Sequence, residues 1–220
     1  MMRAVRGVAV GVLARGLCVP VALAAKGDPQ KKITRAGQAN AIAASLHRAD
    51  FPPTGWQQQP RQPKQKDDSS PRCSYYNPDQ SDLVEIGDYD SPDFDQAGGS
   101  SISSSTGAFK TVAMGKTAYA RVAKPALVKC LAELFKKGAG AAKTTILSAA
   151  PLNFERYGDR SIAYRIVALV KTPTAAVRAY LDVILVNKGS TDIAFLAIGI
   201  QKPLSTALEQ SLVGKVTARA

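Results

Sequence analysis

Three stretches near the C-terminus decide the fold of this chain: SIAYRIVALVK at 161–171, VRAYLDVILV at 177–186 and IAFLAIGI at 193–200. All three are rich in β-branched residues, which favour strands. Turn-forming residues separate them, Thr172-Pro173-Thr174 in the first gap and Asn187-Lys188-Gly189-Ser190 in the second. The pattern predicts three antiparallel strands joined by two hairpins.

Simple hairpins determine which side chains share a face, because successive residues of a strand point to opposite faces of the sheet. One face is then wholly apolar, and we expect helices to pack on it. It consists of Ile162, Tyr164, Ile166, Ala168, Ala179, Leu181, Val183, Leu196 and Ile198. The other face mixes charged, aromatic and aliphatic side chains and places Arg165 opposite Asp182. Its members are Arg165, Val167, Arg178, Tyr180, Asp182, Ile184 and Phe195.

Three stretches repeat apolar residues at helical spacing. The first helix is expected to begin after Thr34 and to stop at Asp50-Phe51-Pro52-Pro53. The second runs from Tyr119 to Lys136-Lys137-Gly138, and Pro125 should kink it or divide it at Lys124. The third begins near Pro203 and closes the chain.

Further strands are expected upstream of the second helix. Leu83–Ile86 is a short candidate, and the serine-rich segment Ser100–Thr106 predicts an exposed or edge strand. Phe109–Met114 belongs to the same strand or to its partner. The fold class is therefore α+β, an antiparallel sheet of about five or six strands with helices packed on it.

The first 24 residues are expected to be a signal peptide. Arg3 and Arg6 supply positive charge, the stretch 8–24 is apolar, and Ala22-Leu23-Ala24 has the small-x-small pattern that signal peptidase reads. Residues 25–220 then form a single α+β domain. Two alternatives stay open. One is an uncleaved membrane anchor, since the apolar stretch is near the lower length limit for a membrane span. The other is a lipoprotein modified at Cys18, although the preceding Arg15, Gly16 and Leu17 are unfavourable for that processing.

The cysteines support export. Cys18 leaves with the leader, so Cys73 and Cys130 remain, and a pair in an oxidising compartment predicts a disulfide. Closing the loop of roughly 57 residues between them would remove about 4 kcal/mol of unfolded-state chain entropy. Two buried free thiols are the alternative.

The chain is strongly basic, with a formal net charge of +12, which becomes +9 once three arginines leave with the leader. The seven carboxylates from Asp79 to Asp95 form an acidic stretch, and basic residues dominate from Lys110 onward. A nucleic-acid partner fits the charge but not the compartment, and no basic and aromatic motif accompanies it. We expect anionic envelope lipids or glycans as partners. A solvated surface without a partner is the alternative.

We find no catalytic, metal or cofactor motif that survives inspection. Gly115-Lys116-Thr117 has the context of a phosphate loop, but Lys110 stands where that motif needs glycine. The one histidine, His47, is expected at the surface; it provides neither a zinc site nor, without G-x-S-x-G, a serine hydrolase. The acidic stretch lacks the spacing of an EF-hand, and its turn-borne carboxylates should be solvated rather than form a glycosidase pair.

The mixed sheet face is the best candidate for a binding site. Arg165 and Arg178 provide guanidinium groups for an acid group, and Tyr180, Asp182 and Phe195 complete a surface suited to an anionic amphiphile. An Arg165–Asp182 cross-strand pair that binds no ligand is the alternative.

Several short motifs carry a family resemblance. They are ADFPPTGW at 49–56, Cys73, NPD at 77–79, SDL at 81–83, YLDV at 180–183, NKG at 187–189 and the closing helix 208–219. The mature chain resembles uncharacterised secreted actinobacterial proteins. More distantly, it is similar to extracellular sensor domains of mycobacterial serine/threonine kinases and to small mycobacterial lipoproteins with a PsbP-like fold. The resemblance implies a PsbP-like sandwich and a sensor-like role, although those sensor domains carry two disulfides and this chain can form one.

The sequence thus favours an exported binding or sensor-like module of the cell envelope for an anionic or amphipathic ligand. The alternative is an assembly factor that docks an envelope protein. It would use the acidic stretch or the segment Gln57–Arg72, which is rich in glutamine, proline and charge and predicts a mobile loop at about 57–72. An enzyme is the third and least favoured hypothesis.

Overall fold

The computed structural model describes residues 27–60, 73–138 and 143–220. The expected signal peptide at 1–24 and most of the expected loop at 57–72 therefore lie outside the described residues. The strands are β1 (Gln30–Lys31), β2 (Trp56–Gln58), β3 (Val84–Asp90), β4 (Phe94–Gln96), β5 (Ser100–Phe109), β6 (Lys143–Pro151), β7 (Arg160–Lys171), β8 (Ala176–Lys188) and β9 (Thr191–Ile200). The helices are α2 (Arg35–Ala43), the 3-10 turn η1 (Arg48–Asp50), α3 (Val112–Val122), α4 (Pro125–Gly138) and α5 (Thr206–Arg219).

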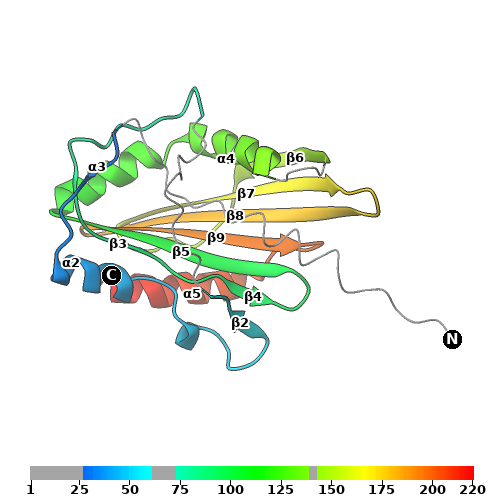
Figure 1. Cartoon of the computed structure of the whole chain (residues 1–220), viewed down its shortest axis with the longest axis horizontal. Coiled ribbons are helices and arrows are strands. Elements are labelled where there is room, and N and C mark those ends of the chain that lie inside the picture. Colours follow the sequence, from blue (N-terminus) through cyan, green and yellow to red (C-terminus); the bar gives the residue numbers. More distant parts are fainter. Residues whose placement is uncertain (1–26, 61–72, 139–142) are drawn as a thin grey trace.

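The α+β class is confirmed, and the sheet is larger than expected. Among the described residues it has nine strands. Seven run in the order β1-β3-β5-β9-β8-β7-β6, β2 pairs with β4 at one side, and every pairing except β1 with β3 is antiparallel. Three of the additional strands have only two or three residues, too few to produce a periodic pattern in the sequence. The sheet lies between two helical layers, with α3 and α4 on one side and α2 and α5 on the other (Figure 1).

The register deduced from the two hairpins is confirmed. Arg165 lies opposite Asp182, and Val183 lies opposite Leu196. At the β8–β9 turn Gly189 has a φ of 58°, which a residue with a side chain rarely adopts. The hydrophobic alternation and the turn chemistry were therefore enough to align these three strands.

The predicted apolar face carries α3 and α4. Leu131 and Phe135 of α4 pack on Ile166, Leu181 and their neighbours in one buried cluster. Pro125 divides the predicted helix in two, because it occupies the first position of α4, where its missing N–H is tolerated. The predicted disulfide between Cys73 and Cys130 is present, with the two Cα atoms 5.6 Å apart.

The second face carries helices as well. Leu212, Val213 and Val216 of α5 are buried against it, in a cluster that includes Phe195 and Ile184 of the sheet. Two buried cores therefore share one sheet, which makes β8 and β9 apolar on both faces over much of their length.

Three local expectations are wrong. Ser100–Thr106 is not an edge strand, because β5 lies between β3 and β9; its buried Ser104 hydroxyl accepts a hydrogen bond from the Leu46 amide (3.0 Å). Phe109–Met114 is not a strand to its end, because the Thr111 hydroxyl accepts from the Met114 amide (3.1 Å) and caps α3. Gln57 and Gln58 are not loop residues, because β2 pairs with β4 through its backbone.

Candidate functional site

A bidentate ion pair between Arg165 and Asp182 lies at the centre of the predicted binding face. Arg165 of β7 donates from Nε to Oδ1 of Asp182 (2.6 Å) and from Nη2 to Oδ2 (2.5 Å), across adjacent strands. The Asp182 side chain is 2% exposed and that of Arg165 is 22% exposed. Asp182 therefore neutralises Arg165 internally, which removes most of this guanidinium's capacity to hold a ligand.

A second carboxyl group reaches this pair from the helical layer. Glu209, on the first turn of α5, has no exposed surface. Burial raises the pKa of Glu209 to about 9, and the neighbouring Asp182 carboxylate adds to the effect, while Arg165 opposes it. The Glu209 oxygens have no hydrogen-bond partner among the described residues, and a pKa of about 9 keeps this carboxyl group protonated at neutral pH. The three groups together are neutral, and α5 keeps the two carboxyl groups out of a substrate's reach.

Beyond Arg165, helix α5 no longer covers this face of the sheet. In Figure 1, α5 lies beneath one half of the sheet, and the β7–β8 hairpin extends past it. On this uncovered half the apolar side chains of Val167, Leu169 and Tyr180 are only partly buried. Val167 lies opposite Tyr180 across the two strands, so they form one continuous apolar strip.

Three cations surround this strip. Lys143 of β6 lies directly opposite Lys171 of β7, and Arg178 of β8 lies opposite Leu169. All three are exposed, and none has a side-chain hydrogen bond or ion pair within the described chain. Like charges directly opposite each other on a sheet repel, so an anion placed between them would be stabilised.

We call this surface the open sheet face. It comprises Lys143, Thr145, Ser148, Val167, Leu169, Lys171, Arg178 and Tyr180, which the strand register places on one side of β6, β7 and β8.

The five residues proposed from the sequence lie in three different environments. Arg178 and Tyr180 belong to the open sheet face, and Arg165 and Asp182 form the neutral pair at its inner border. Phe195 lies opposite Ile184 in the core beneath α5 and has no exposed surface. Lys143 was missed because β6 lacks an alternating pattern, whereas Lys171 could have been found by extending the alternation of β7 by one step.

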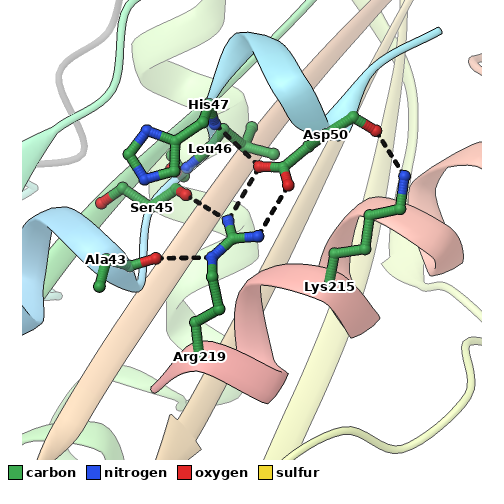
Figure 2. A network of polar contacts seen from close by, with 8 residues as sticks. Ala43, Ser45, Leu46, His47, Asp50, Lys215 and Arg219 are labelled. Carbon is green, nitrogen blue, oxygen red and sulfur yellow. Dashed lines mark hydrogen bonds and ion pairs between the residues drawn. The ribbon is translucent and has the colours of Figure 1, made fainter.

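Helix α5, which covers the same side of the sheet next to the open sheet face, is fixed at its C-terminal end by a polar network (Figure 2). Arg219 donates to both oxygens of Asp50 (2.7 and 2.9 Å), and also to the carbonyls of Ala43 (2.7 Å) and Ser45 (2.8 Å). Lys215 donates to the Asp50 carbonyl (2.6 Å). Burial alone would raise the pKa of Asp50, but the bonds from Arg219 and the neighbouring backbone amide outweigh it and lower the pKa.

The acidic stretch from Asp79 to Asp95 is occupied by internal contacts. Arg121 forms a two-pronged pair with Asp82, and Lys31 lies 2.6 Å from Asp88. Asp79 accepts from the Ser81 amide (3.0 Å), and the other four carboxylates also have partners. In the described ranges no group of three or more His, Cys, Asp or Glu side chains is arranged to hold a metal.

No known protein family matches this chain, and neither does any curated protein. Within the described ranges, no helix combines the length and the apolar character that crossing a membrane requires. A functional assignment therefore rests on the geometry and charge of the open sheet face.

Proposed function

We propose that this protein is an exported binding module of the cell envelope that docks its open sheet face on an anionic lipid surface. One observation carries the proposal: three cations without partners in the described chain surround a strip of partly exposed apolar side chains on one uncovered half of the sheet. Cations attract anionic lipid head groups. Apolar side chains beside those cations can then insert into the boundary between the head groups and the acyl chains.

The expected affinity is modest. A lysine or arginine close to an anionic membrane contributes about 1 kcal/mol, so three of them contribute about 3 kcal/mol. Partial burial of Val167, Leu169 and Tyr180 adds about 1 kcal/mol for each 40 Å² of apolar surface removed from water. We therefore expect reversible docking, with an apparent Kd between about 10 μM and 1 mM lipid.

The disulfide is consistent with the proposed compartment. A bond between Cys73 and Cys130 persists in an oxidising environment and is rare in a reducing one. The proposed relation to secreted actinobacterial proteins and to PsbP-like lipoproteins supports the same location. Export itself is tested by the N-terminal sequence of the protein isolated from its host, which should begin at Ala25.

Vesicle sedimentation tests the docking face. The protein should sediment with vesicles of equal parts phosphatidylglycerol and phosphatidylcholine, and much less with phosphatidylcholine alone. Replacing Lys143, Lys171 and Arg178 by glutamine should weaken binding by about a hundredfold, since about 3 kcal/mol is removed.

A matched control separates this face from net charge. Lys116→Gln, Lys124→Gln and Lys137→Gln remove the same charge from exposed positions on or beside α3 and α4. That variant should bind almost as the parent does; equal losses in both variants would refute the assignment of the face. Binding to the soluble polyanion dextran sulfate but not to the vesicles would replace the lipid with a glycan as the partner.

A further inference from the structure

A groove of about 600 Å³ lies on the opposite side of β6 from the open sheet face. Its lining is mainly apolar, it is open to solvent, and its volume is within the range of small-molecule sites. We call it the α4–β6 groove; it is lined by Tyr75, Lys129, Ala132, Glu133, Lys136, Ile146 and Ala149.

The floor of the groove is an exposed margin of the core. Ile146 and Ala149 of β6 lie opposite Ala168 and Ile166 on the face that α4 covers, whereas Ser148 pairs with Val167 on the other face. Both floor residues pack against the buried cluster but are not fully covered. An apolar ligand that packs on these two residues would remove their exposed apolar surface from water, which favours binding.

The disulfide builds one wall of this groove. Cys73 begins a turn that ends at Tyr76, and Tyr75 lies within it, 49% exposed. Cys130 is the neighbour of Lys129, so the Cys73–Cys130 bond holds the turn against the helix that supplies the opposite wall. The Tyr76 hydroxyl also donates to the Val122 carbonyl (2.7 Å). The backbone of the turn that carries Tyr75 is therefore fixed before any ligand binds.

The charges of the groove favour an anion. Lys129 and Lys136 lie seven residues apart on α4, about 10 Å along its axis and on one side of the helix. Glu133 lies between them and also lines the groove; burial raises the pKa of the Tyr75 hydroxyl, and the neighbouring Glu133 carboxylate adds to this. Neither lysine has a hydrogen bond or ion pair in the described parts of the chain, so the lining has a net positive charge.

The edge of β6 argues against a peptide strand as the occupant. β6 is the last strand in the sheet order, but its register shifts between Ile146 and Ser148, and Pro151 ends it. A bulge and a terminal proline are devices that obstruct pairing by a further strand. A single small molecule needs no such pairing.

We propose that the α4–β6 groove binds one anionic amphiphile, with its hydrocarbon chain on Ala132, Ile146 and Ala149 and its acid group beside the ammonium groups of Lys129 and Lys136. This site is independent of the open sheet face, because different residues form it on the other side of the sheet. A carboxylate and a phosphate head group meet the same two lysines, so both sources fit.

Fluorescence titration with 11-(dansylamino)undecanoic acid tests the site, using the full chain with its disulfide intact. The acid should bind with a stoichiometry of about one probe per protein molecule. Its methyl ester should bind about tenfold more weakly, since the ester has no charge. Lys129→Gln with Lys136→Gln should weaken binding of the acid by about tenfold but leave that of the ester unchanged. Ala149→Trp, which fills the floor, should abolish binding of both.

Two controls keep the outcome interpretable. Lys116→Gln with Lys137→Gln removes the same charge outside the groove and should leave the titration unchanged. Lys171→Gln with Arg178→Gln alters the open sheet face and should also leave it unchanged, so this site can fail or hold independently of vesicle docking. Thermal unfolding of each variant verifies that the protein is folded.

Two results would overturn the proposal: no binding of the acid by the parent protein, or undiminished binding by a folded Ala149→Trp variant. Competition by lysophosphatidic acid and by lauric acid then identifies the preferred head group. Equal affinity for the acid and its methyl ester would refute the role of the lysines.

Discussion

The carboxyl group of Glu209 lies buried beside the ion pair of Arg165 and Asp182, and burial raises its pKa to about 9. An ionised Glu209 would be removed from water beside a like charge, the Asp182 carboxylate. Protonation of Glu209 makes the cluster neutral. Its stability should therefore depend on pH.

Glu209→Gln should flatten the pH dependence of stability. The pKa of Glu209 is about 9 in the folded protein, against 4.5 for a glutamate in water. A raised folded pKa stabilises the fold fully below pH 4.5, and this stabilisation is lost as pH rises toward 9, by up to about 1.4 kcal/mol per pH unit. Glutamine is neutral throughout and keeps the shape of the protonated acid.

Urea unfolding at pH 5, 7 and 9 measures this difference. Burial also raises the pKa of Asp192, to about 7, which gives the same sign of dependence, but mainly below pH 7. The change between pH 7 and 9 therefore belongs to Glu209. A variant that loses stability over this interval as steeply as the parent would contradict the raised pKa of Glu209.

Arg165→Met should destabilise the protein by about 3–5 kcal/mol, because it leaves the nearly inaccessible Asp182 carboxylate without its partner. Adding Asp182→Leu should restore much of this loss, since replacing both members of a buried pair by apolar groups is often close to neutral. Arg178→Met is the matched control: this exposed arginine has no ion-pair partner among the described residues, so its loss should change stability by less than about 0.5 kcal/mol. Chemical denaturation of the parent and the three variants measures these differences in stability.

The sequence predicted the parts of the fold that depend on a repeating pattern. The alternation in β7, β8 and β9 determined register and faces, and the proline at 125 located the break between α3 and α4. It could not predict β6, whose Thr144 and Ile146 are followed by a bulge that interrupts the alternation. Nor could it show that α5 covers only half of the mixed face, since helix placement depends on packing rather than on local pattern.

The candidate site was predictable to the same degree. Arg178 and Tyr180 were found because their strand was found, and Lys143 was missed because its strand was missed. Phe195 was included because the sequence predicted the sheet face on which it lies, but not that α5 covers this part of the face. The α4–β6 groove joins a turn and a helix that the disulfide holds together, and the sequence contains no signal for its shape.

Arg219→Met should detach the C-terminal end of α5 from the segment around Asp50. The substitution removes four hydrogen bonds, two of them to the Asp50 carboxylate, whose side chain is 6% exposed. We expect a loss of about 2–4 kcal/mol. Arg219→Lys should recover less than half of it, because an ammonium group cannot reproduce the two-pronged contact. Recovery of full stability by lysine in thermal unfolding would contradict this geometry.

Removal of the disulfide should lower the midpoint of thermal unfolding by about 8–16 °C. The bond closes a loop with a sequence separation of 57, which constrains the unfolded chain by about 4 kcal/mol, and each kcal/mol corresponds to about 2–4 °C in a domain of this size. Cys73→Ala with Cys130→Ala is the suitable variant, because both side chains are buried and alanine introduces no polar group. Reduced parent protein should melt close to this variant, whereas a parent that melts at the same temperature with and without reductant would show that the bond does not constrain the chain. Since Tyr75 is held over α4 by the same bond, the folded double variant should also bind the dansyl acid more weakly than the parent while docking on anionic vesicles unchanged.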